Sequence, residues 1–363
     1  MDYKSGVNDF VEYWAVGRLL LSRENPYSPA RLLELQTSVG WTESQPLVMW
    51  NPPWATIFVL PFGFLPYSIA QVLWLLLNVT LMVVATSHLW QIYRQRNEGH
   101  QLAWLLSFTF IPVPLALLFG QISGLVLFGI AQFLRMEQRK SWIAMGATTI
   151  LISIKPHPVY LFWIALLLWT IKERQFYVAL GAFIAFAIGT AVPLVLSPNL
   201  ITAYLALPSN PAVINPFDLD TPALGRVLRK LLTAESPAVQ FLPSLTGIAW
   251  LLVHRHRQRH IWNWNEELPR ILLVSITTAA FAWTYDLIVV VPALMQVAAR
   301  MFRKGKPSFV LYAAVIYTFI TGIYWMSKLF LRADFWSFWL SPVLLLTYLF
   351  FRNHSPNPTL NSD

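Results

Sequence analysis

Residues 67–92, YSIAQVLWLLLNVTLMVVATSHLWQI, decide the fold class of this chain. The stretch contains no Lys, Arg, Asp or Glu, and a helix needs only about 20 predominantly apolar residues to cross the hydrocarbon core of a bilayer. Inside a bilayer each backbone polar group must find its partner within the protein, which a helix provides. The sequence therefore predicts a membrane-spanning helix at this point.

The composition extends this prediction to the whole chain. Hydrophobic residues make up 56% of it and charged residues only 12%, whereas soluble domains carry about 25% charged residues. The formal net charge is +9, but the basic residues are scattered over short loops, a membrane pattern that does not indicate a nucleic-acid partner. Because the chain has no cysteine, disulfides and thiolate metal sites are excluded. We expect an all-α, polytopic transmembrane bundle.

Further apolar runs predict about eleven spanning or half-spanning segments. Several of them are shorter than a typical span, so they must lie in thinned bilayer or beside a water-filled cavity. The expected segments are residues 67–92, 102–119, 122–134, 142–154, 158–171, 176–196, 238–254, 268–284, 286–302, 307–330 and 335–351.

The basic loops orient the bundle. Lys and Arg cluster after alternate segments, and the positive-inside rule places those loops in the cytoplasm. The remaining polar turns then share the outer face. Reading 142–171 as one helix would bury Lys155 in the membrane, at a cost of about 2.5–3.5 kcal/mol, so we favour a hairpin.

This orientation divides the chain into three parts. Residues 1–66 form an outer-face loop with short interfacial helices, one of them over 10–22, whose apolar positions recur at helical spacing. Residues 67–351 form the bundle, with a large outer loop at 197–237, and 352–363 form a disordered cytoplasmic tail. No signal peptide or apolar segment precedes residue 66 to carry Met1 outside, so either an N-terminal helix is missing or the second segment drives insertion.

A carboxylate opens the outer-face loop. Asp9 precedes an amphipathic run, and a general base must be a carboxylate or an imidazole placed at the reaction cavity. An aspartate at this position is also a common helix cap, so both roles are open. Four further polar motifs fall on the same face: Trp50-Asn51-Pro52-Pro53, Gly120-Gln121, Lys155-Pro156-His157-Pro158 and Tyr285-Asp286.

These motifs, in this order, resemble glycosyltransferase family 87. The resemblance rests on Asp9–Trp14, Asn25-Pro26-Tyr27, Asn51-Pro52-Pro53, Gly120-Gln121 and Lys155-Pro156. The family includes phosphatidylinositol mannoside mannosyltransferases. It implies the GT-C architecture, a catalytic acid in the first outer loop, and polyprenyl-phosphate sugars as donors.

The chain departs from the family pattern at two places. A transmembrane helix usually precedes the first motif in the family. A late Ser-Pro-x-Ser-Trp-x-His motif corresponds here to residues 279–286, in which Trp283 matches and Tyr285 stands at the histidine. The departure at Tyr285 puts a catalytic role for that position in doubt.

The remaining candidates bind the donor. Lys155 and His157 are candidates for its phosphate, although such side chains also snorkel to the interface. Arg226 and Arg229 suit bidentate phosphate contacts, and attraction to anionic headgroups explains them equally well. No divalent metal or other cofactor is indicated, because His254, His256 and His260 lie in a basic inner-face run.

Four other positions complete the predicted site. Gln121 is a candidate hydrogen-bond partner for a sugar hydroxyl, and Trp50, with Asn51 beside it, for stacking on a sugar ring. Asp286 either orients a cation or sugar, or pairs with Lys328 or Arg332.

We therefore predict an integral, multi-pass plasma-membrane enzyme with its active site outside the cytoplasm. It is expected to be an inverting hexosyltransferase that moves a mannose-like sugar from a polyprenyl phosphate to a glycolipid or lipid-linked acceptor. Two alternatives stay open: a transporter or flippase of a lipid-linked sugar, and an inactive assembly subunit. Transporters usually contain inverted repeats with helices broken at the middle of the membrane, and this sequence shows no repeat.

Overall fold

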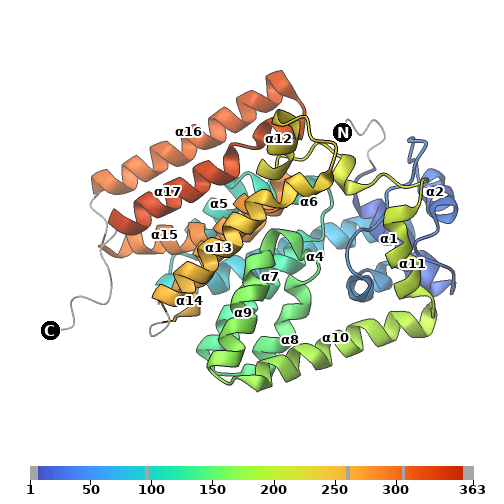
Figure 1. The fold of residues 1–363 in the computed structure, drawn as a ribbon, viewed down its shortest axis with the longest axis horizontal. Helices are drawn as coiled ribbons and strands as arrows, with labels where there is room; N and C mark the ends of the chain where they lie inside the picture. The colour runs from blue at the N-terminus through green and yellow to red at the C-terminus, as the bar shows by residue number, and fades with distance from the viewer. Residues whose placement is uncertain (1–6, 95–97, 259–261, 305–306, 355–363) are drawn as a thin grey trace. The chain divides into compact units, whose positions relative to one another are not determined.

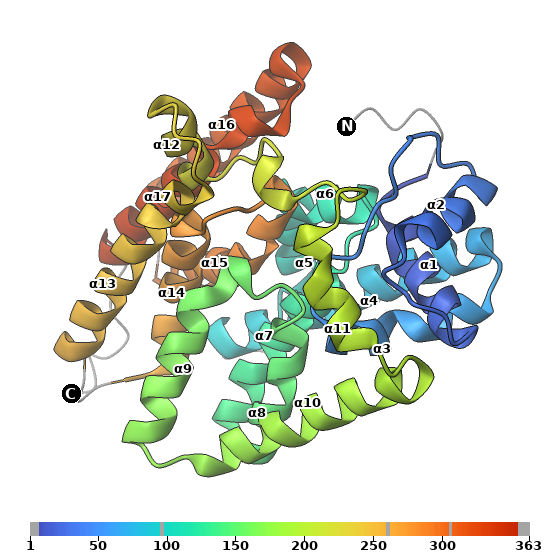
Figure 2. The same ribbon diagram turned by 45° about the vertical axis from the view of Figure 1, so that its right-hand side comes forward.

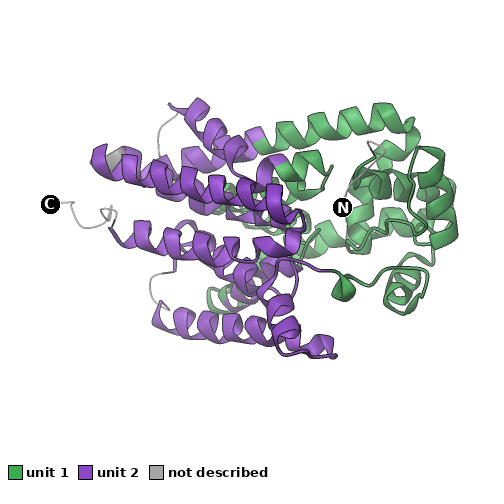
Figure 3. Cartoon of the chain, turned by 90° about the horizontal axis from the view of Figure 1, so that it is seen from above, with its two compact units in different colours: residues 1–82, 115–156, 169–219 green, residues 83–114, 157–168, 220–363 purple. Residues whose placement is uncertain are grey.

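The computed structural model describes residues 7–94, 98–258, 262–304 and 307–354. This part of the chain is all-α, with seventeen α-helices and short 3₁₀ turns between them (Figure 1). It divides into two compact units. Unit 1 comprises residues 1–82, 115–156 and 169–219, and unit 2 comprises 83–114, 157–168 and 220–363 (Figure 3).

Six helices are long and apolar enough to cross a membrane, or seven spans if one bent pair counts as one. They confirm a multi-pass membrane protein, whereas the expected count of about eleven segments is not confirmed. The six are Tyr67–Arg94, Phe176–Leu196, Pro237–Arg257, Thr284–Phe302, Pro307–Leu331 and Asp334–His354.

The bent pair occupies the segment that we expected to be one helix over 102–119. Helix α5 (His100–Thr109) and helix α6 (Pro112–Leu118) meet at an angle of 69°. The break has a local cause: the ring of Pro112 disfavours helical backbone at the preceding residue, and proline has no N–H to continue the helix.

The other expected segments form shorter helices. They are α7 (Ser123–Gln138), α8 (Trp142–Ile152), α9 (Tyr160–Lys172) and α14 (Trp264–Thr278). At its C-terminal end α14 stops at Thr278, because Ala279 is extended, so residues 268–284 are not one helix. At the end of the chain, α17 (Leu340–His354) continues three residues into the expected tail. The rest of that tail lies outside the described residues.

Unit 1 combines the short helices before residue 67 with the first part of the long helix that follows and with a group of three helices that contact one another. Helices α1 (Phe10–Leu21), α2 (Pro29–Ser38) and α3 (Thr56–Val59) precede α4 (Tyr67–Arg94). Helix α8 packs against both α7 and α10 (Phe176–Leu196) (Figure 2). A Cβ atom at Gly146 of α8 would lie 1.9 Å from the carbonyl oxygen of Val178 in α10. Only glycine permits this close approach, a recurrent device of helix pairs in membranes.

Unit 2 is a bundle around the buried helix α14. Its neighbours are α13 (Leu242–Arg257), α15 (Val291–Lys304) and α17. A short helix, α12 (Leu224–Leu231), precedes α13, and α16 (Pro307–Leu331) is the least buried of the six long helices.

Candidate active site

The start of α1 is fixed to the turn that follows α6. The backbone N–H of Asp9 donates to the carbonyl of Phe119 at 3.0 Å, and the indole N–H of Trp74 donates to the carbonyl of Gly120 at 2.8 Å. Gly120 has a φ of +66°, a left-handed conformation that costs little for glycine alone. This turn places Gln121 directly beside Asp9.

Gln121 joins a carboxylate to an ammonium group. Its Nε2 donates to Oδ2 of Asp9, and its Oε1 accepts a hydrogen bond from Nζ of Lys155 at 2.6 Å. The hydroxyl of Tyr13 also lies 3.4 Å from this Oε1. Asp9, Gln121 and Lys155 are all buried. Three predicted site residues, far apart in sequence, thus form one hydrogen-bonded cluster within unit 1.

The contacts argue against the alternative roles of the two charged residues, a side-chain helix cap for Asp9 and snorkelling for Lys155. The side chain of Asp9 makes no capping hydrogen bond at the start of α1; the neighbouring Asn8 accepts instead from the N–H of Phe10 at 3.3 Å. Lys155 is 7% exposed, which is not what snorkelling to the interface predicts, since a snorkelling head group reaches water.

Glu12 is a second carboxyl group at this cluster that the sequence reasoning missed. Burial raises the pKa of Glu12 well above its ordinary value, the negative charge of Asp9 raises it further, and Tyr13 and Lys155 act against this rise. The side chain is half-buried. A spacing of three residues places Asp9 and Glu12 on the same side of a helix, so the Asp9-x-x-Glu12 pattern was a usable signal. We refer to Asp9, Glu12, Tyr13, Gln121 and Lys155 as the carboxylate–lysine cluster.

The Trp50–Trp54 segment holds the backbone that carries Lys155. The amide of Asn51 donates to the carbonyl of Ile154 at 2.9 Å, and the indole of Trp54 donates to the hydroxyl of Ser153 at 2.8 Å. The carbonyl of Trp50 accepts from the hydroxyl of Tyr204 at 3.1 Å, and the ring of Trp50 is half-buried. Asn51 thus contacts the backbone next to Lys155 and positions it.

A second group of predicted residues lies in unit 2. Nε2 of His157 is 3.6 Å from Oδ2 of Asp286, too long for a hydrogen bond, and the imidazole stacks on Phe281 with ring centroids 4.4 Å apart. Asp286 also accepts from the N–H of Trp283 at 2.9 Å. Tyr285 stacks on the Trp283 ring at 6.1 Å.

Other predicted candidates have protein partners. Arg226 binds Oδ1 of Asp220 through Nη2 at 2.9 Å, and Arg229 donates to the carbonyls of Ala234 and Glu235. Lys328, a proposed partner of Asp286, donates to Asp334 at 2.6 Å. Both arginines therefore have a local structural role in the segment before α13, and contact with a phosphate would have to replace or share these hydrogen bonds.

The described part of the chain contains no group of three or more His, Asp or Glu side chains able to hold a metal ion. His254 instead contacts Glu267, with 2.6 Å between Nε2 and Oε2. His260 lies outside the described residues.

Fold and site define a multi-pass helical membrane protein with a buried cluster of acid, amide and ammonium groups. The sequence model of glycosyltransferase family 87 matches residues 50–275. The chain belongs to this family, and it is a membrane glycosyltransferase. The match contains the motifs at Trp50, Gly120 and Lys155, whereas Asp9 and residues 279–286 lie outside it. No curated protein and no solved structure matches the chain.

Proposed function

We propose that this glycosyltransferase moves a hexose, mannose-like in character, from a polyprenyl phosphate to a hydroxyl group of a glycolipid or lipid-linked acceptor. The observation that carries the proposal is the buried chain of hydrogen bonds from Asp9 through Gln121 to Lys155. It supplies a proton acceptor and a cation, the two groups that transfer from a sugar phosphate requires.

Asp9 is the proposed base. As the acceptor oxygen attacks the anomeric carbon, its proton passes to the Asp9 carboxylate, while the bond between that carbon and the phosphate oxygen breaks. Attack from the face opposite the phosphate inverts the configuration. The Gln121 amide orients the carboxylate by donating to Oδ2, as a positioned general base requires.

Lys155 is the proposed partner of the departing phosphate. The electron pair of the breaking bond stays on the lipid phosphate, and an ammonium group placed in a buried site stabilises that developing charge. His157, Arg226 and Arg229 are proposed as further phosphate contacts, with Trp50, Tyr285 and Asp286 for the sugar. This assignment follows from their chemistry and from the family's donor class.

The donor can be tested directly on the purified full chain reconstituted in lipid vesicles. We expect transfer from a polyprenyl-phosphate hexose and none from a nucleotide-linked hexose, with product followed by a radiolabelled sugar. Asp9→Asn should lower the rate of product formation by about 100-fold or more, and Glu43→Gln, which removes an exposed carboxyl group of the same region, should leave it unchanged. Transfer from the nucleotide sugar alone would refute the proposed donor class.

The proposed GT-C arrangement places this chemistry on the outer face of the plasma membrane. Because the chain has no cysteine, single cysteines report orientation without background. We expect Ser209→Cys, in the outer loop, to react with an impermeant thiol reagent in intact cells, and Arg257→Cys, at the end of α13, to stay unreactive. Both positions are exposed in the structure. The reverse labelling pattern would place the site inside.

A further inference from the structure

The far end of the unit 2 bundle contains a second charged cluster, which takes no part in the proposed transfer. Helices α13, α14, α15 and α17 contribute to it. Arg300 and Arg352 both contact Oε2 of Glu266, the latter at 3.6 Å. Arg270 lies 3.8 Å from Glu267. We call His254, Glu266, Glu267, Arg270, Arg300 and Arg352 the basic cluster.

The basic cluster has more positive than negative groups. Three arginines and a histidine face two glutamates, and two of the guanidinium nitrogens, Nε of Arg270 and Nη1 of Arg352, are buried without a hydrogen-bond partner in the described part of the chain. A buried charged donor without a hydrogen-bond partner destabilises the folded state. Phosphate oxygens are the acceptors that guanidinium groups bind best.

A tyrosine of α4 adds a third unsatisfied group. The hydroxyl of Tyr93 is buried and has no hydrogen-bond partner among the described residues. It interacts electrostatically with Glu266 and Arg300, so it lies in the same environment. A hydroxyl can donate to a phosphate oxygen in the same way as an arginine N–H.

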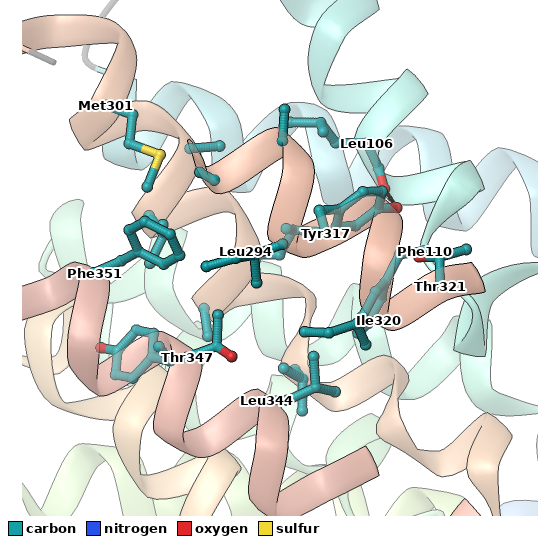
Figure 4. A pocket seen from close by; sticks show the side chains of 18 of the residues that line it. Leu106, Phe110, Leu294, Met301, Tyr317, Ile320, Thr321, Leu344, Thr347 and Phe351 are labelled. Atoms are coloured by element: carbon teal, nitrogen blue, oxygen red, sulfur yellow. Dashed lines mark hydrogen bonds between the residues drawn. The ribbon is translucent and has the colours of Figure 1, made fainter. Parts of the chain in front are cut away.

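An apolar cavity of about 300 Å³ lies next to this cluster, between α5, α15, α16 and α17 (Figure 4). Its lining includes Met301 and Phe351, which are the chain neighbours of Arg300 and Arg352. Tyr348 joins the two features. Its side chain lines the cavity, and its hydroxyl donates to Gln296 at 2.7 Å and interacts electrostatically with Arg270 and Arg300.

We propose that this end of unit 2 binds an anionic phospholipid, with the phosphate at Arg270 and Arg352 and an acyl chain in the cavity. Tyr348 lines the cavity and interacts with two arginines of the cluster. This proximity favours a lipid over a free phosphate, because a free phosphate leaves the apolar space unused. The outer wall of the cavity is α16, the least buried of the long helices, so a membrane lipid reaches it sideways. Basic pockets between membrane helices are a known type of lipid headgroup site.

The test uses the purified full chain in neutral detergent. Native mass spectrometry compares bound dioleoyl phosphatidylglycerol with dioleoyl phosphatidylcholine, and the Tm is measured with each lipid and with inorganic phosphate. We expect the wild-type chain to bind the anionic lipid about ten-fold or more tightly than the neutral one, as for charge-assisted contacts. The anionic lipid should also raise the Tm more than inorganic phosphate does.

Three variants test the arginine charge and the cavity separately. Arg352→Gln should remove the preference for the anionic lipid, and Arg257→Gln, which removes an exposed charge at the end of α13, should keep it. Ala313→Phe fills the cavity from α16 and should weaken binding of the long-chain lipid without changing the response to inorganic phosphate.

Equal retention of the two lipids by the wild-type chain overturns the proposal, and so does an equal rise in Tm with inorganic phosphate. Unchanged lipid binding in Ala313→Phe would show that no acyl chain lies in the cavity. If Arg352→Gln fails to fold, the wild-type comparison and Ala313→Phe still decide the question. None of these outcomes depends on glycosyl transfer.

Discussion

The carboxylate–lysine cluster and the His157–Asp286 pair differ in how completely their polar groups are bonded. In the first, the Gln121 amide contacts both Asp9 and Lys155, the latter at 2.6 Å. In the second, His157 stands 3.6 Å from Asp286 and its buried Nε2 has no hydrogen-bond partner in the described chain. The carboxylate–lysine cluster therefore holds its geometry without substrate, as proton transfer requires. The His157–Asp286 pair instead has an imidazole nitrogen that can bind a ligand.

The largest effect that this comparison predicts is at Asp9. Asp9→Asn keeps the shape of the side chain and removes its basicity, so transfer should fall by about 100-fold or more. Glu12→Gln should retain most of the activity, because burial and the charge of Asp9 already favour the neutral form of Glu12. Initial rates of the two variants check this, with expression and donor binding as controls. Wild-type rates in Asp9→Asn would end the assignment of the base.

The next effect concerns the donor phosphate. Lys155→Ala should weaken binding of a polyprenyl phosphate by about ten- to hundred-fold, since charge-assisted contacts contribute about 1.5–3 kcal/mol. His157→Gln should weaken it by about ten-fold at most, as for a neutral hydrogen bond. Equilibrium binding of the lipid phosphate without its sugar measures both. A larger loss at His157 than at Lys155 would reverse the roles that we give to the two regions.

A smaller effect is expected at the turn beside Asp9. A Cβ atom at Gly120 would lie 2.7 Å from Oδ1 of Asn8, and the left-handed backbone there costs a residue other than glycine about 1–2 kcal/mol. Gly120→Ala should therefore lower the Tm and slow transfer by displacing the start of α1. Gly322→Ala, where a new Cβ meets nothing within 4 Å, is the matched control. Equal Tm values for the two variants would show that the turn is not constrained.

The smallest effect is a pH dependence of stability. The pKa of Glu12 is raised in the folded chain, so the folded state binds more protons than the unfolded state above the ordinary value of 4.5. The free energy of unfolding therefore falls as pH rises from that value through the raised pKa. Glu12→Gln has no such proton to lose, so its Tm should depend less on pH in this window. Parallel Tm profiles for wild type and variant would contradict this.

Part of the fold follows directly from sequence. Long apolar runs predicted the helices α4, α10 and α16, because a helix satisfies all its backbone polar groups within one segment of a membrane protein. Pro112 alone predicts the break, but the apolar residues on both sides of it favoured one continuous helix. Short helices such as α8 and α14 could not be counted as spans, since hydropathy does not distinguish a half-span from a helix buried in protein.

The site was predictable only in part. A shared face was enough to group Asp9, Gln121 and Lys155, whose functional roles stay predictions. Sequence periodicity does not reveal which polar groups pair across 112 positions, as Gln121 and Asp9 do. The pairing of Arg226 with Asp220 depends on the path of the chain before α13, which no local pattern specifies.

The length of α8 has a consequence for substrate choice. The helix has 11 residues, which at about 1.5 Å per residue gives roughly 16 Å, about half of a 30 Å hydrocarbon core. It begins just after the exposed Arg139 and Lys140, at the membrane surface by the positive-inside pattern. A helix of this length cannot cross the core alone, so the bilayer beside the Lys155 turn must be thinned or a water-filled cavity must be present there. A thinned bilayer brings the phosphate of a lipid-carried donor close to that turn while its chain stays in the membrane, whereas a donor dissolved in water has no such anchor.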